Sequence, residues 1–170
     1  MSALGHYLEE EGIATVSISL IRPQTERTRP PRALWVPFEL GRPLGPPSDP
    51  TVQRRVAIVS SAGLVRRGEE PFRGRDADFR VIPGDVTPEQ LLVSHISINF
   101  DRTGFQEDRN VVFPLDRLNK LAAEGVIGSV AATHYAFMGA TDPVQMEPYA
   151  REVAGRLKQD QVDAVILTPV

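Results

Sequence analysis

The stretch Asp163–Val170, with the sequence Asp-Ala-Val-Ile-Leu-Thr-Pro-Val, contains four successive apolar residues, which predict a buried β-strand. Arg55–Ser60, with the sequence Arg-Val-Ala-Ile-Val-Ser, has the same character and is the clearest strand in the chain. Segments with helical spacing of apolar residues alternate with these strands. This alternation predicts the α/β class, with a mostly parallel open sheet, flanking helices and Rossmann/flavodoxin-like layering.

The remaining elements are predicted from apolar spacing and from glycine and proline. In the helix expected at 143–159, Tyr149, Val153 and Leu157 should point inward. Gly139 is free to adopt a positive φ angle. The proline-rich segment Pro37–Pro50 is expected to be an ordered surface loop. Further helices are expected at 1–11 and 115–122, a single helical turn near Thr87, and strands at 13–20, 33–36, 79–82 (an edge strand) and 91–98.

The composition indicates one globular domain spanning residues 1–170. Of the 170 residues, 24% are charged and the formal net charge is −3, so no basic face indicates nucleic acid or an anionic membrane as a partner. No apolar run approaches the roughly 20 residues that span a bilayer, and we expect a cytoplasmic protein. The chain has no cysteine, which excludes disulfides and thiolate-rich metal sites. We also find no metal-site spacing.

Three residues where a strand gives way to a loop, Ser60, Ser61 and Gly63, form a first candidate site. Their hydroxyls and free backbone N–H groups could hold a carboxylate or a phosphate. The stretch lacks the glycine spacing of a dinucleotide-binding fingerprint and the lysine of a P-loop. A plain tight turn therefore explains it equally well.

A second candidate site combines His95 with the polar loop that follows it, which carries Asp101, Asp108 and Asn110. A lone histidine on an apolar strand is more often a hydrogen-bonded core residue, but loops at strand ends are where substrate contacts are usually built. His134 could join His95 as a general acid/base pair if the two rings meet. The sequence leaves both interpretations of these histidines open.

Five segments, taken together and in order, resemble the selenoprotein B family of the glycine, sarcosine, betaine and D-proline reductases. In that family, a strand similar to Ala164–Val170 is followed at once by a redox motif of the form U/C-x-x-C. The five segments are Val59–Leu64, Phe79–Pro83, Asp108–Leu118, His134–Gly139 and Asp163–Val170.

The resemblance has an unusual segment order. Residues 1–50 resemble the part of the family that follows the redox motif, and residues 51–170 resemble the part that precedes it. We therefore expect either a permuted domain or a chain cut at a UGA codon for selenocysteine after Val170. In the second case the catalytic selenocysteine or cysteine would lie just after Val170, outside this chain.

The resemblance also implies a reaction, in which a selenolate or thiolate displaces the amine from the α-carbon of a small amino acid. It implies a pyruvoyl group on a partner subunit and a dithiol electron donor such as thioredoxin, and a homo-oligomer is compatible with it. The chain, as a subunit or fragment of this reductase, would carry no cofactor and would be inactive alone. The residues that would line the pocket are Ser60, Ser61, His95, Asp101, Asp108, Asn110, His134 and Thr168.

Two other functions remain open from the residues themselves. The first is a non-catalytic α/β domain that binds a small carboxylate or a partner protein. The second is an acid/base enzyme that uses His95 and His134 without a redox step. A downstream coding segment for U/C-x-x-C would support the reductase, whereas loss of activity in a His95→Ala variant of the same chain would support the acid/base enzyme.

Overall fold

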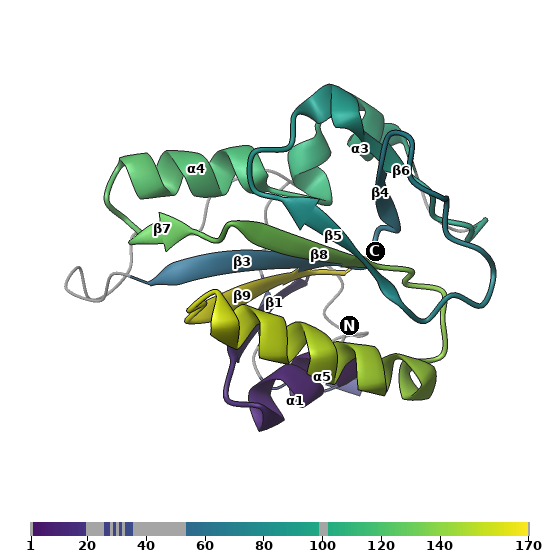
Figure 1. Cartoon of the computed structure of the whole chain (residues 1–170), viewed down its shortest axis with the longest axis horizontal. Helices are drawn as coiled ribbons and strands as arrows, with labels where there is room; N and C mark the ends of the chain where they lie inside the picture. The colour runs from purple at the N-terminus through teal and green to yellow at the C-terminus, as the bar shows by residue number, and fades with distance from the viewer. Residues whose placement is uncertain are drawn as a thin grey trace.

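The computed structural model describes residues 2–19, 26–27, 29, 31, 33–35, 54–98 and 102–169 (Figure 1). The predicted loop at 37–50 lies outside these residues. The elements are α1 (Ser2–Glu10), β1 (Ala14–Ser19), β2 (Ala33–Trp35), β3 (Arg55–Ser60), β4 (Leu64–Arg66), β5 (Phe79–Pro83), η1 (Pro88–Gln90), β6 (Leu91–Val93), α3 (Thr103–Glu107), η2 (Arg109–Val111), α4 (Leu115–Ala123), β7 (Ser129–Val130), β8 (Thr133–Phe137), α5 (Pro143–Gln159) and β9 (Ala164–Thr168).

The described residues form a seven-stranded sheet in the order β2-β1-β9-β3-β8-β5, with β7 also paired to β3. The strands pair in parallel except for β5, which runs antiparallel to β8 at one edge. The predicted α/β class with a mostly parallel sheet and flanking helices is therefore confirmed, as is the edge position of 79–82. β9 lies between β1 and β3, so the strand predicted within Asp163–Val170 is a central strand of the sheet.

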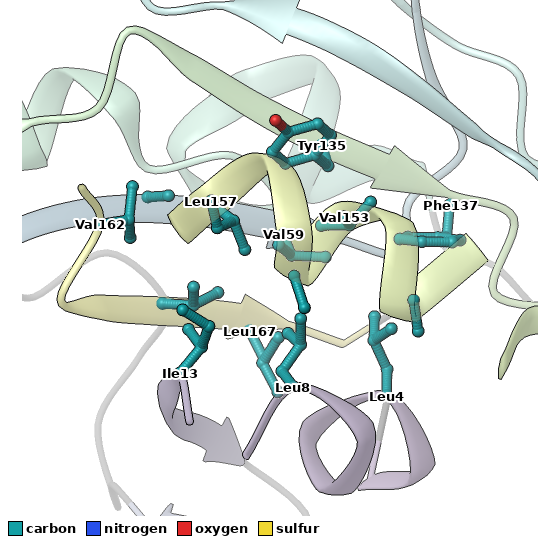
Figure 2. Close-up of a cluster of buried hydrophobic side chains, with 14 of the residues drawn as sticks. Leu4, Leu8, Ile13, Val59, Tyr135, Phe137, Val153, Leu157, Val162 and Leu167 are labelled. Carbon is teal, nitrogen blue, oxygen red and sulfur yellow. The ribbon is translucent and has the colours of Figure 1, made fainter. Parts of the chain in front are cut away.

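Helices cover the two faces of the sheet, as Figure 1 shows: α1 and α5 lie on one face and α4 on the other. Alternation along the strands sends Val59 and Leu167 into the α1/α5 face, where Leu8 and Leu157 meet them (Figure 2). The intervening strand residues, including Ile58 and Ile166, pack toward α4. Both layers therefore exclude water from the central strands, which accounts for their continuous apolar composition.

Helix α5 confirms the predicted bounds 143–159 and most of the predicted inward face. Asp142 caps it, since its carboxylate accepts a hydrogen bond from the backbone N–H of Val144 (3.0 Å). Val153 and Leu157 are fully buried. Tyr149 is 36% exposed, so its predicted inward orientation is wrong. No helix in the described part of the chain is both long and apolar enough to cross a membrane.

Two local predictions differ from the structure, and one strand was not predicted. The strand predicted at 91–98 ends at Val93, where β6 forms a separate two-stranded sheet with β4, so His95 lies in the following loop. The segment that begins at His134 belongs to strand β8, which apolar spacing alone did not reveal. Gly139 does not have a positive φ angle. Its small size matters instead, because a Cβ there would lie 2.8 Å from the carbonyl oxygen of Ser61.

Candidate functional site

The carboxyl ends of the two central strands carry paired hydroxyls. Ser60 ends β3, Thr168 ends β9, and the two residues are register partners in the parallel pair. Both side chains are buried and both donate a hydrogen bond to the carbonyl oxygen of Val112, at 2.8 Å from Ser60 and 2.9 Å from Thr168. Their hydroxyl protons are therefore used within the protein.

The backbone N–H groups of Ser61, Ala62 and Gly63, in the turn after β3, all donate hydrogen bonds within the protein. The N–H of Ser61 donates to the carbonyl of Thr168 (3.1 Å), and the N–H of Gly63 donates to that of Phe137 (2.9 Å). The N–H of Ala62 donates to the hydroxyl of the serine that ends β3 (3.2 Å). The prediction that free N–H groups here could hold an anion is therefore wrong. Gly63 adopts φ +64°, the left-handed conformation that glycine tolerates best.

Two glycines allow neighbouring segments to approach this turn closely. The N–H of Gly139 donates to the carbonyl of Ser61 (2.9 Å), and the carbonyl of Gly63 accepts from the N–H of Ser94 (2.8 Å). A Cβ at Gly63 would lie 3.1 Å from the backbone nitrogen of His95. Glycine at both positions therefore brings the end of β8 and the His95 loop against the end of β3.

His95 lies in this loop with its side chain inside the protein, where the residue is 5% exposed. The backbone N–H of Ser97 donates to Nδ1 of His95 (3.2 Å), and the guanidinium of Arg102 donates to its carbonyl oxygen (2.9 Å). Burial lowers the pKa of His95, and the nearby positive charge of Arg102 lowers it further. The imidazole is therefore mainly neutral at pH 7, with its proton on Nε2, because Nδ1 acts as an acceptor.

His134 lies on β8, between β3 and the edge strand β5, and has a different environment. Val56 pairs with Val130, whereas Val59 pairs with Tyr135. An advance of three residues along β3 therefore matches an advance of five residues from β7 to β8, so the register of the pairing changes between these two strands. Ile58 falls in this register change, and its backbone N–H donates to Nδ1 of His134 (3.0 Å). The ring takes the place of a backbone acceptor.

The ring of His134 is fully enclosed. The residue is 0% exposed, and burial lowers its pKa to about 4, although the charge of Asp160 acts in the opposite direction. The Phe113 ring packs against it edge to face, with 5.5 Å between the ring centroids. His95 lies beyond the end of β3 beside Gly63, whereas His134 is level with the middle of that strand, so this geometry does not support an acid/base pair.

A short polar turn leads to the carbonyl that receives the two hydroxyls. Oδ1 of Asp108 accepts from the backbone N–H of Asn110 (2.9 Å) and from its side-chain amide (2.8 Å). Oδ2 forms an ion pair with Arg117 (3.3 Å). The backbone hydrogen bond from Asn110 is the main reason that the pKa of Asp108 is below its usual range, and the Asn110 amide and Arg117 add to the effect. Asp108 is therefore a fixed carboxylate at neutral pH.

The structure thus brings together most of the predicted site residues that it describes. Ser60, Ser61 and Thr168 meet directly, and Asp108 and Asn110 join them through the adjoining turn. His95 lies against the same edge, His134 lies apart in the sheet, and Asp101 falls outside the described residues. Sequence reasoning missed the carbonyl of Val112 and the close approach of Gly139. For the Val112 carbonyl, the available signal was that two apolar strands, β3 and β9, both end in a hydroxyl-bearing residue.

The described residues contain no cluster of three or more histidine and carboxylate side chains placed to hold a metal ion. The sequence also contains no cysteine. The edge offers a neutral imidazole, a fixed carboxylate and backbone groups that are already paired. Such groups can enclose and orient a small polar molecule.

Comparison with known families identifies the chain. The model of the glycine/sarcosine/betaine reductase selenoprotein B family matches residues 46–170, which is more than half of the sequence. The chain belongs to this family. Every candidate site residue, from Ser60 to Thr168, lies within the matched part of the selenoprotein B family. The resemblance noted from the five sequence segments is therefore confirmed.

Individual relatives of this family are subunits of reductases. The chain is 37% identical over 116 residues to the D-proline reductase subunit gamma of Acetoanaerobium sticklandii, covering 66% of the chain and 47% of that relative. It is 33% identical over 133 residues to the glycine reductase complex component B subunit gamma of Symbiobacterium thermophilum, covering 74% and 30%. It is 38% identical over 119 residues to the betaine reductase complex component B subunit beta of Peptoclostridium acidaminophilum, covering 66% and 27%.

The chain therefore spans less than half of the length of these relatives. No solved structure matches it.

Proposed function

We propose that the chain supplies one wall of the substrate site in a reductase acting on a small amino acid of the glycine, sarcosine, betaine or D-proline type. Membership of the selenoprotein B family carries this proposal. The geometry supports it, because the hydroxyl-bearing ends of β3 and β9 lie at the edge of a parallel sheet where α/β proteins usually bind their ligands.

The nucleophile has to be a group that the chain does not contain, since it has no cysteine. A selenolate or thiolate, when present at this edge, supplies the nucleophile that displaces the amine. The chain's own part is to enclose and orient. His95 and Arg102 lie together at the edge, and the cation of Arg102 favours any nearby anion. Asp108 is held as a carboxylate by Asn110, which suits an ammonium group of a substrate.

We therefore assign to the pocket the side chains of His95, Asp108 and Asn110, together with the hydroxyls of Ser60 and Thr168. His134 is assigned a supporting role in the sheet, because its Nδ1 already accepts the N–H of Ile58. The proposed partners are a pyruvoyl-bearing subunit and a thioredoxin-type dithiol donor. Relatives of the chain are named as subunits of multi-component complexes, which supports partner subunits in general. Such thiol chemistry requires a reducing compartment, so we propose a cytoplasmic location.

The test is a reductase assay on the complex that copurifies with a tagged copy of this chain from its native host. Each of the four amino-acid substrates is added in turn, and oxidation of dithiothreitol is followed as loss of free thiol. We expect one substrate to drive thiol oxidation, and prior alkylation with iodoacetamide to abolish it. Amino-acid binding by calorimetry without any thiol oxidation would contradict the reductase and favour the non-catalytic binding domain.

Variants of two histidines test whether His95 belongs to the pocket. In the same complex, His95→Asn should lower the rate of thiol oxidation, because the pocket loses the imidazole at its edge. His134→Asn keeps a side-chain acceptor for the N–H of Ile58 and should leave the rate per assembled complex close to that of the wild type. An unchanged rate in His95→Asn would contradict the assignment of His95 to the pocket.

A further inference from the structure

Two hydroxyls from different strands donate to one backbone carbonyl at the carboxyl ends of β3 and β9, where the substrate site is proposed. The oxygen of Val112 accepts from Ser60 (2.8 Å) and from Thr168 (2.9 Å). A carbonyl oxygen has two lone pairs, so both hydrogen bonds can exist together. This arrangement joins three segments that are distant in sequence: the end of β3, the end of β9 and the turn before α4.

Each of the two residues is held by more than one contact. The Ser60 oxygen also accepts from the N–H of Ala62 (3.2 Å), which determines the direction in which its own proton points. The carbonyl of Thr168 accepts from the N–H of Ser61 (3.1 Å), so its backbone and side chain are both held. Ser60 is fully buried and Thr168 is 7% exposed, so water offers the two hydroxyls little competition.

The carbonyl of Val112 is part of the 108–112 turn, which also carries the carboxylate of Asp108. The N–H of Val112 donates to the carbonyl of Arg109 (3.1 Å), and Asp108 accepts the N–H of Asn110 (2.9 Å). A shift of the Val112 carbonyl therefore moves the whole 108–112 turn. The two hydroxyl contacts therefore connect the ends of β3 and β9 to the turn that carries Asp108.

We propose that Ser60 and Thr168 are positioning residues, which hold the 108–112 turn against the end of β9 and so fix the distance between Asp108 and the site at the strand ends. This inference rests on the proposed reductase function for its catalytic consequence. The mechanical part, the coupling of the turn to the strands, stands on the contacts alone.

The mechanical part is tested on the 170-residue chain by amide hydrogen exchange measured with NMR. Thr168→Val removes one hydroxyl at nearly constant volume, and exchange of the Val112 and Phe113 amides should become about fivefold faster. Thr168→Ser keeps the hydroxyl and should restore slow exchange. Ile166→Val on the same strand and face is the matched control, which should lose stability without accelerating these two amides selectively.

The double variant Ser60→Ala/Thr168→Val leaves the carbonyl buried with neither hydroxyl donor. The exchange rate of the same amides should then rise by about thirtyfold. If both the single and the double variants exchange like the wild type at Val112, the coupling does not exist and the proposal is refuted.

The catalytic part is tested in the copurified complex, with rates normalised to the nucleophile titrated by iodoacetamide. Thr168→Val should lower kcat/KM by on the order of tenfold, because misplaced groups lose effective concentration, and Thr168→Ser should recover it. Normal kinetics in Thr168→Val would refute the positioning role even if exchange changes. A wild-type complex that oxidises no dithiol would instead refute the proposed function, while the exchange result still decides the coupling.

Discussion

Lowering the pH from 7 to 5 is expected to destabilise the protein through His134. Burial holds the pKa of this ring at about 4 in the folded state, whereas an exposed histidine in the unfolded chain titrates near 6.5. Between these two values the unfolded state binds the proton and the folded state does not. The free energy of unfolding therefore falls as the pH drops below about 6.5, and this contribution levels off below about pH 4.

The magnitude follows from the size of the pKa difference. Each unit of pKa is worth about 1.4 kcal/mol, so the lowering to about 4 corresponds to about 3 kcal/mol in total. The part lost between pH 7 and pH 5 is about 2 kcal/mol, since the unfolded histidine is already partly protonated at pH 7 and the folded ring is still neutral at pH 5. This is a large fraction of the stability of a typical domain.

The variant His134→Asn isolates this effect. Its amide oxygen can still accept the N–H of Ile58, but the side chain does not titrate. Urea unfolding followed by far-UV circular dichroism at pH 7, 6 and 5 should show a wild-type loss about 2 kcal/mol greater than that of the variant. NMR titration of the wild type should show the His134 ring signal constant down to pH 5. Equal losses in the two proteins would refute the argument.

Four further substitutions test local interactions that stabilise the fold. Gly139→Ala should destabilise the protein by about 2 kcal/mol in thermal unfolding, because its Cβ would lie 2.8 Å from the carbonyl oxygen of Ser61; Gly155→Ala has open space inside α5 and should stabilise it by about 0.5–1 kcal/mol. Leu118→Ala in α4 should cost about 2–5 kcal/mol in urea unfolding, since its side chain is buried under the sheet. Asp160→Ala should cost about 1–3 kcal/mol by the same method, because a backbone N–H and an arginine lose their acceptor.

The elements that sequence patterns predicted well are those in which one periodicity runs without interruption. β3 and α5 have the predicted bounds, because an apolar run and a helical apolar stripe with a capping aspartate each specify one structure. β6 was predicted too long because Ile96 and Ile98 continue the β-branched pattern after Val93, although they lie outside the paired strand and are 44% and 98% exposed. In this segment, apolar residue type predicted neither burial nor which backbone N–H groups are paired.

The site was harder to predict for a related physical reason. The hydroxyls of Ser60 and Thr168 could be located at strand ends from the sequence, but their common acceptor is a main-chain carbonyl that any residue at position 112 would provide. The role of His134 depends on a register change between β7 and β8, which the sequence does not mark with a glycine or proline. Contacts made by the backbone of a distant segment leave little trace in local patterns.

Helix α1 and strand β1 both pack beside β9, a central strand of the sheet. β1 and β9 are parallel neighbours, with Ala14 opposite Ala164. Helix α1 packs over the same sheet, where a Cβ at Gly5 would lie 3.1 Å from the Leu167 side chain. A strand, a helix and an adjacent parallel strand are the parts of a βαβ unit, here read from β9 through α1 to β1. The contacts among β9, α1 and β1 therefore have the arrangement of a βαβ unit, although α1 and β1 precede β9 in this chain.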